Sequence, residues 1–276
     1  MRKISAFAGL ILLTSLVMLS CQKSKTDATS ANDISAETIA KIQALGFSTD
    51  QVAKVSNGYR VEGDIVLTNE LLNKGESSSK DLRIATTEQY RTTNLVNGLP
   101  RTVKILVSNL GTAYVQGTDL AISRYNALGL RMTFQRITSG TPDITIIGFN
   151  QGPSGGYITL GSSGFPTSSG NPYNEIQMNT NAQAYGSNPD VNYVGSVIQH
   201  ELGHCIGFRH TDYMDRSYSC GGRRVNEEKP KSGLGAILIP GTPSGPDAES
   251  WMLACSNGGN RTFNANDVIA LNYLYK

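Results

Sequence analysis

The chain has 276 residues, of which only 17% are charged, and its formal net charge is +2. That length is enough for one large domain or two modest ones. Arg2 and Lys3 precede an apolar run. Without these two residues, the number of basic residues falls from 24 to 22, which equals the number of acidic residues. This neutral balance excludes any charge argument for nucleic acid or an acidic membrane surface as a partner.

The first 21 residues have the pattern of a signal peptide. The apolar run over 6–19 is too short for a membrane span, and Ser20 and Cys21 follow it. A small residue directly before a cysteine resembles the cleavage site of bacterial lipoproteins, in which that cysteine receives a lipid. We therefore expect Cys21 to anchor the protein in the bacterial cell envelope, at the outer membrane or cell surface. The alternative is an ordinary signal peptide and a secreted protein.

After Cys21, residues 22–34 are polar and predict a flexible tether. A small module at 35–95 follows, which is too short to bury much apolar surface alone. Its first element should be a helix from Ser35 to Gly46, because serine caps helix N-termini and glycine ends helices readily. Two further elements are expected in the module: a helical turn at 49–55 and a strand at 59–68.

Residues 99–276 predict a larger α+β domain. Apolar residues recur at helical intervals over 112–128, and Gly129 ends that helix. Strands are expected at 102–108, 130–137, 143–149 and 174–180. Further helices are expected at 194–208 and after the capping residue Asn264. The order strand, helix, strand implies a sheet with parallel members and with helices packed on it.

All three histidines of the chain lie within residues 200–210. His200 and His204 are four residues apart, so on a helix both imidazoles project from one face, as a tetrahedral zinc requires. Gly207 can adopt the left-handed conformation that ends a helix without a steric penalty. The chain would then turn back, and His210 would become the third ligand.

Glu201 follows His200 in the chain and is rotated from it by about 100° on a helix, so its carboxylate should border the metal rather than bind it. A zinc ion held by three neutral imidazoles lowers the pKa of bound water towards about 7. Glu201 would take the proton of that water and later pass it to a leaving amine. The alternative, two ordinary polar histidines on an amphipathic helix, would require the glutamate, the glycine and the third histidine to coincide by chance.

The stretch from His200 to His210 resembles the long zinc-binding motif of the metzincin clan of metalloendopeptidases. Within the clan it is most similar to the dual-action HEIGH metallopeptidase family of bacterial lipoproteins, with Leu202 where the naming motif has isoleucine. The resemblance covers roughly 101–276. It implies a metzincin-like catalytic domain: a twisted mixed sheet with an antiparallel edge strand, a zinc-binding helix, a loop-rich lower half with a methionine turn, and a C-terminal helix. It also implies one catalytic zinc ion and a protein or peptide substrate.

Two further expectations follow from this resemblance. Residues 250–252 resemble the methionine turn, so Met252 should lie beneath the metal. The edge strand would be formed by five consecutive residues, Gly156, Tyr157, Ile158, Thr159 and Leu160. In the clan this edge pairs with the extended substrate, because unpaired backbone groups bind a peptide main chain largely regardless of its sequence. A glycine-rich surface loop is the alternative for these five residues.

Metzincins are commonly made as latent precursors, in which a cysteine or an aspartate of a prosegment occupies the fourth zinc position. The resemblance therefore favours a prosegment for the module at 35–95, against a permanent structural module. Cys21 would be consumed by the lipid, which leaves an acidic residue such as Asp64 as the candidate plug. A solvent-facing carboxylate is the alternative for Asp64. The polar stretch 73–93 predicts an exposed linker that a protease can cut.

Three cysteines remain once Cys21 is assigned to the lipid, and an odd number cannot all pair within the chain. Cys205 has small apolar neighbours in the expected zinc helix, so we expect a buried free thiol. Cys220 and Cys255 both lie in loops and can form a disulfide. A bridge from Cys205 to Cys255 stays open.

The leading hypothesis is thus a monomeric zinc-dependent endopeptidase. A second hypothesis is a surface lipoprotein that binds protein or glycan without turnover and holds a structural zinc. Glu201 argues against the second hypothesis, because a pure binding protein does not need a carboxylate at that position.

Overall fold

The computed structural model describes residues 34–74, 89–222, 235–243 and 245–276. The expected signal peptide, Cys21 and nearly all of the tether lie outside these ranges, as does most of the expected linker. No helix among the described residues has both the length and the apolar composition needed to cross a membrane.

The described chain forms seven helices and ten strands, and the longest of them lie close to the expected positions. The strands are β1 (Ala53–Val55), β2 (Gly58–Val61), β3 (Ile65–Thr68), β4 (Tyr90–Arg91), β5 (Arg101–Val107), β6 (Met132–Ile137), β7 (Ile144–Phe149), β8 (Gly161–Ser163), β9 (Glu175–Asn179) and β10 (Ile237–Leu238). The helices are α1 (Ala36–Ala44), α2 (Asn69–Lys74), α3 (Thr112–Asn126), α4 (Ala182–Tyr185), α5 (Val191–Cys205), α6 (Ser217–Cys220) and α7 (Ala265–Tyr275).

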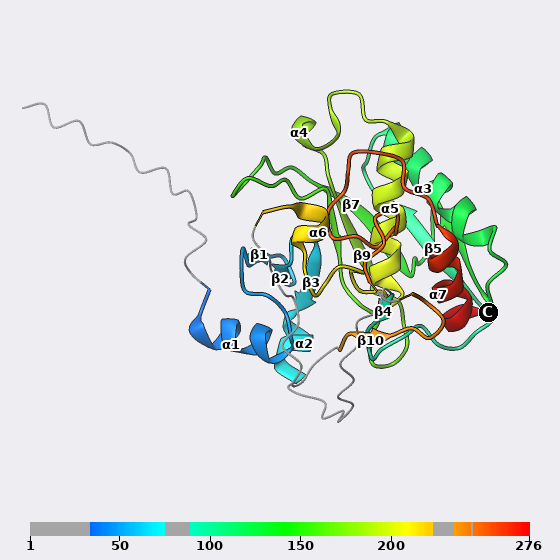
Figure 1. The fold of residues 1–276 in the computed structure, drawn as a ribbon. Coiled ribbons are helices and arrows are strands. Elements are labelled where there is room, and N and C mark those ends of the chain that lie inside the picture. Colours follow the sequence, from blue (N-terminus) through cyan, green and yellow to red (C-terminus); the bar gives the residue numbers. More distant parts are fainter. Residues whose placement is uncertain (1–33, 75–88, 223–234, 244) are drawn as a thin grey trace, which may run out of the picture.

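One eight-stranded mixed sheet runs through the molecule in the order β1-β2-β3-β8-β9-β7-β5-β6 (Figure 1). Strands β9, β7, β5 and β6 are mutually parallel, and β8 is antiparallel to β9. This arrangement confirms the α+β class and the parallel members that the strand, helix, strand order predicted. The C-terminal helix α7 also begins as predicted, with Asn264 and Asp267 forming a capping box.

Helices α3 and α5 lie side by side over the sheet (Figure 1), and two glycines set how closely they approach. A Cβ atom at Gly117 would lie 3.0 Å from the backbone nitrogen of Gly195, and one at Gly195 would lie 3.2 Å from the carbonyl oxygen of Gly117. Any side chain at either position would push the helices apart. The contact therefore fixes how α5, which carries two of the histidines, sits beside α3.

The N-terminal module has a hydrophobic cluster of its own, to which the larger domain contributes one ring. The cluster consists of Ile42, Leu45, Phe47, Val52, Val61, Ile65, Leu67, Leu72 and Phe165. The module also shares the main sheet, because β3 pairs in parallel with β8 through Ile65 and Ser163. The module is thus joined to the rest of the molecule by both backbone pairing and apolar contact.

Two predictions for the module were wrong. Residues 49–55 do not form a helical turn, because their last three residues are strand β1. The strand expected at 59–68 is a hairpin, in which β2 and β3 are joined by three residues, 62–64. Glu62 and Gly63 have φ values of 55° and 93°, which end the extended run and reverse the chain. The turn places Asp64 at the tip of this hairpin.

Two boundaries also differ from the sequence-based expectation. Strand β4 pairs with β10, and the backbone nitrogen of Thr92 donates to Gly207, so 90–92 pack on the larger domain rather than on the module. The edge strand expected at Gly156–Leu160 begins later, since β8 starts at Gly161. Ahead of it, Ser154 and Tyr157 form only an isolated bridge. The pattern of apolar and polar residues around 156–160 did not predict that the strand paired with β9 would begin at Gly161.

Candidate metal centre

The helix α5 presents two of the three histidines. The side chain of Asp190 caps its N-terminus by accepting from the backbone nitrogen of Tyr193. At the other end Gly207 has a φ of 111°, and a Cβ there would lie 2.9 Å from the carbonyl oxygen of Asn94. Only glycine fits both the conformation and the space. The turn at Gly207 returns the chain so that His210 faces the helix.

Four side chains bring one ligand atom each to within 4.8 Å of one another: Asp64, His200, His204 and His210. The Nε2 atoms of His204 and His210 are 3.2 Å apart, and Oδ2 of Asp64 lies 3.2 Å from Nε2 of His210. The same oxygen lies 3.4 Å from Nε2 of His200. Ligands about 2.0–2.1 Å from a tetrahedral zinc are separated by about 3.3 Å. The spacing therefore fits a tetrahedral ion with Asp64 in the fourth position.

The hydrogen bonds of the rings fix which nitrogen is available for a metal. Nδ1 of His200 lies 2.9 Å from the carbonyl oxygen of Trp251, and Nδ1 of His204 lies 2.8 Å from that of Phe208. A carbonyl oxygen only accepts, so each Nδ1 donates and each Nε2 keeps a lone pair. Nε2 of His200 is buried and has no hydrogen-bond partner among the described residues. A cation between these lone pairs would satisfy them.

Electrostatics agree with a neutral, metal-binding form of the buried ring. Burial lowers the pKa of His204 well below its usual value, and the neighbouring imidazoles of His200 and His210 lower it further. For Asp64, burial would raise the pKa, but the imidazoles of His210 and His200 outweigh burial and hold it well below its usual range. Burial thus favours the neutral, metal-binding form of His204, and the cluster joins imidazole nitrogens to one carboxylate, a donor set suited to zinc.

Glu201 lies beside this cluster and is 1% exposed. The hydroxyl of Ser163, on β8, donates to Oε2 of Glu201 over 2.7 Å. A Cβ at Gly161 would lie 2.7 Å from Oε1, so the glycine at the start of β8 makes room for the carboxylate. Burial raises the pKa of Glu201 well above its usual value, and the carboxylate of Asp64 adds to this effect. A raised pKa makes the carboxylate a stronger base towards a nearby water.

Sequence reasoning missed the roles of Gly161 and Ser163. Both contact Glu201 from almost forty residues away in the chain, and nothing in their local pattern indicates the contact. For Asp64, the sequence left two interpretations, a plug of the metal site and a solvent-facing carboxylate. The hairpin carries Asp64 into the histidine cluster, where its side chain is 14% exposed. The alternative of a solvent-facing carboxylate does not describe this position.

The residues expected to form the methionine turn lie against α5. Met252 is fully buried, and its carbonyl oxygen accepts from the backbone nitrogen of Thr211. A Cβ at Gly203 would lie 2.5 Å from Sδ of Met252, so the helix glycine between the two histidines leaves space for the thioether. The carbonyl of Trp251 holds His200, as described above. The turn therefore supports the histidines through a backbone carbonyl and a packed side chain.

Cys220 and Cys255 form a disulfide, and Cys205 is a buried free thiol. Asp212 lies beside the bridge, where its Oδ1 accepts from the backbone nitrogen of Ala254. The bridge and this hydrogen bond connect the loop after the third histidine to the loop after the methionine turn. Both loops are thereby held beneath the cluster.

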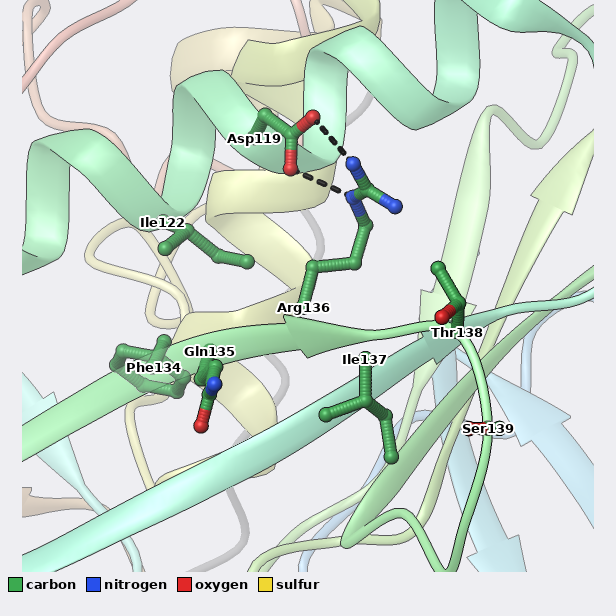
Figure 2. A pocket seen from close by; sticks show the side chains of 8 residues that line it. All are labelled: Asp119, Ile122, Phe134, Gln135, Arg136, Ile137, Thr138 and Ser139. Atoms are coloured by element: carbon green, nitrogen blue, oxygen red, sulfur yellow. Dashed lines mark hydrogen bonds and ion pairs between the residues drawn. The ribbon is translucent and has the colours of Figure 1, made fainter.

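A surface hollow of about 600 Å³ lies elsewhere, between α3 and the edge strand β6 (Figure 2). Its charged lining residues, Asp119 and Arg136, already form an ion pair of 2.6 Å with each other. Strand β6 and strand β8 are separated by three strands of the sheet. The hollow is therefore remote from the histidine cluster and provides no chemistry of its own.

A family model described as the dual-action HEIGH metallo-peptidase matches residues 59–275, most of the chain. The chain belongs to this family. It is accordingly a zinc metalloendopeptidase, and the histidine cluster is the group that can hold its single metal ion. The resemblance seen in the sequence is confirmed, and the matched region includes the hairpin that carries Asp64.

Two solved structures of myroilysin are similar to this metallopeptidase. One is 16% identical with a TM-score of 0.42 and covers 66% of this chain and 96% of its own. The other is 15% identical with a TM-score of 0.38 and covers 76% of this chain and 98% of its own. A comparison with curated proteins found no match.

Proposed function

We propose that this metallopeptidase cleaves peptide bonds within protein substrates with Glu201 as its general base and acid, and that the described chain is its latent form. A zinc ion on the three imidazoles would lower the pKa of a bound water towards about 7 and polarise a carbonyl group. The observation that carries the proposal is the buried Glu201 carboxylate, oriented by Ser163 beside three histidines with available Nε2 atoms.

Glu201 would hold and move the proton. Ser163 donates to Oε2 and so fixes the plane of the carboxylate, which leaves Oε1 to accept a proton from water. Because burial and Asp64 raise the pKa of Glu201, the carboxyl group can keep that proton until a leaving amine nitrogen takes it. Departure of Asp64 would remove its share of this effect, and burial, the larger cause, would continue to raise the pKa of Glu201.

The position of the hairpin tip, residues 62–64, supports a latent form in which the metal site is blocked. Asp64 lies where a water or a substrate carbonyl would need to bind, 3.2 Å from Nε2 of His210. The carbonyl oxygen of Asp64 also accepts from the backbone nitrogen of Ser163, and β3 covers the outer edge of β8. An extended peptide would require the same edge. The module thus competes with substrate for both the metal position and the strand edge.

The site of action is part of the same proposal. Cys21 after an apolar leader supports a lipid-anchored protein of the bacterial cell envelope, with secretion as the alternative. A single polypeptide supplies all the residues of the site, so a monomer suffices for activity. An anchored peptidase made in latent form would become active only after its linker is cut.

The test uses the chain without residues 1–21, loaded with zinc, before and after limited trypsin cleavage. Casein hydrolysis should appear after cleavage and should fall about 10²–10⁴-fold in Glu201→Gln, because a general acid–base residue contributes that much. The matched control is Glu37→Gln, since Glu37 is an exposed carboxylate of α1. Zinc content should be unchanged in both variants.

A different result would support the non-catalytic hypothesis. If the cleaved wild-type chain binds one zinc per molecule and hydrolyses neither casein nor unfolded peptides, the catalytic proposal is refuted. Equal activity in wild type and Glu201→Gln would leave a peptidase but would remove Glu201 from its role.

A further inference from the structure

Arg209 is a buried arginine directly before the ligand His210 in the chain, and it is 1% exposed. Its Nη2 lies 3.6 Å from Oε2 of Glu62, which is itself fully buried. The guanidinium group also lies 4.5 Å from the ring centroid of Phe47. Both partners, the carboxylate and the aromatic ring, belong to the N-terminal module.

Among the described residues, the catalytic domain alone provides few hydrogen-bond acceptors and no carboxylate for this guanidinium group. Nη1 donates to the carbonyl oxygen of Gly235 over 3.0 Å, and the ring of Tyr213 lies 5.8 Å away. Nε and Nη2 of Arg209 make no hydrogen bond within the described part of the chain. A buried guanidinium group that loses its carboxylate partner is strongly destabilised until another anion pairs with it. When the module leaves, Arg209 therefore becomes a positive group in need of an anion.

A second arginine of the catalytic domain faces the same hairpin tip. Nη2 of Arg216 would lie 3.3 Å from a Cβ atom at Gly63, the central residue of the tip. The residues on either side of Gly63 are Glu62 and Asp64, so an acidic tip lies against two arginines. One of its carboxylates approaches the metal ligands, and the other pairs with Arg209.

We infer that Arg209, with Arg216 beside it, forms a subsite for an acidic side chain of the substrate. In the latent chain Glu62 occupies this subsite in the way that a glutamate or aspartate of a substrate would occupy it after release. This inference rests on the proposed function and adds to it a substrate class, peptides with an acidic residue close to the cleaved bond. The planar guanidinium group suits a carboxylate because it can donate two parallel hydrogen bonds.

The preference should be measurable on matched peptides. Hydrogen bonds between charged groups contribute enough to favour a carboxylate over a neutral amide by about 10–100-fold. We would first map the bonds that the trypsin-cleaved, zinc-loaded chain cuts in a mixture of unfolded proteins. Peptides built around one such site, with glutamate or glutamine at the enriched position, then give the ratio of kcat/KM values.

Wild type should show enrichment of Asp and Glu within three residues of the cut bond and a Glu-to-Gln ratio of about 10–100. Arg209→Gln should bring that ratio close to one. Arg216→Gln, which changes a less buried side chain, should lower the ratio and keeps the test informative if Arg209→Gln misfolds. The matched control is Arg136→Gln, because Arg136 pairs with Asp119 at the far edge of the sheet.

Each outcome has one meaning. A wild-type ratio near one, or a ratio unchanged in both Arg209→Gln and Arg216→Gln, overturns the subsite while casein hydrolysis leaves the peptidase function standing. A zinc-loaded, cleaved chain that cuts neither casein nor any peptide overturns the proposed function and the subsite with it.

Discussion

Replacement of Asp64 by asparagine tests the latent state most directly. The change keeps the shape of the side chain and removes the charge that faces His200 and His210. A zinc ion held by the three imidazoles would be the buried cation that pairs with the carboxylate of Asp64, and removing one partner of a buried ion pair costs about 3–5 kcal/mol. The side chain of Asp64 is only 14% exposed, so solvent screening reduces this figure little.

The cost falls on the docked state alone, because Asp64 leaves the imidazoles when the hairpin opens. Each 1.4 kcal/mol changes an equilibrium constant by a factor of about ten, so the open fraction should rise by a factor of about 150 to 4,000. The remaining contacts of the module, such as the ion pair between Arg209 and Glu62, stay in place. We therefore expect activity from an uncut chain that still carries its module.

The assay is the initial rate of casein hydrolysis by uncut Asp64→Asn, compared with uncut wild type and with both chains after trypsin cleavage. Mass spectrometry must show that the chain stays uncut during the assay. Asp50→Asn is the matched control, since Asp50 is an exposed aspartate of the same module. If uncut Asp64→Asn remains as inactive as uncut wild type, although its cleaved form is active and binds zinc, Asp64 does not block the site.

Three further predictions concern the support of the cluster. Gly161→Ala should lower kcat at least about tenfold with zinc content unchanged, because the new Cβ would lie 2.7 Å from Oε1 of Glu201 and displace it; unchanged kcat would remove the need for this glycine. Gly203→Ala should lower the free energy of unfolding by about 1–3 kcal/mol, as measured in urea, because the Cβ would overlap Sδ of Met252; equal stability would contradict the packing. Burial raises the pKa of Asp267 to about 7, from an ordinary value of 3.8. The folded chain binds this proton more tightly, so the stability it contributes is complete below about pH 4 and is lost as the pH rises through about 7. Asp267→Asn should remove that part of the pH dependence of unfolding, and an unchanged profile would refute the assignment.

The zinc motif could be predicted from the sequence because its geometry is local. His200, His204 and Gly207 lie within three turns of one helix and its end, where 3.6 residues per turn decide which side chains share a face. The same holds for the capping of α7 by Asn264 and for the strand and helix pattern of the sheet. Short-range periodicity and capping chemistry suffice for these features.

The contacts that complete the site depend on long-range pairing, which a local pattern does not contain. Ser163 reaches Glu201 only because β8 lies antiparallel to β9, and Asp64 reaches His210 only because residues 62–64 form a turn. The apolar run on both sides of that turn resembled a single strand. Glu62 at positive φ gave no signal, since glutamate rarely adopts this conformation.

The position of Phe165 determines what happens to the module once its linker is cut. This ring belongs to the catalytic domain, yet it fills the module's own hydrophobic cluster and stacks 6.2 Å from Phe47. A departing module leaves Phe165 behind and keeps a gap the size of a phenyl ring in its own cluster. The larger domain loses Val66, and the partly buried Val55 packed against it, from its main core. Loss of a buried phenylalanine lowers the free energy of unfolding by about 3–5 kcal/mol. A fragment as small as the module is only marginally stable and does not tolerate a loss of this size. The released piece should therefore unfold and be degraded, which makes activation a one-way event.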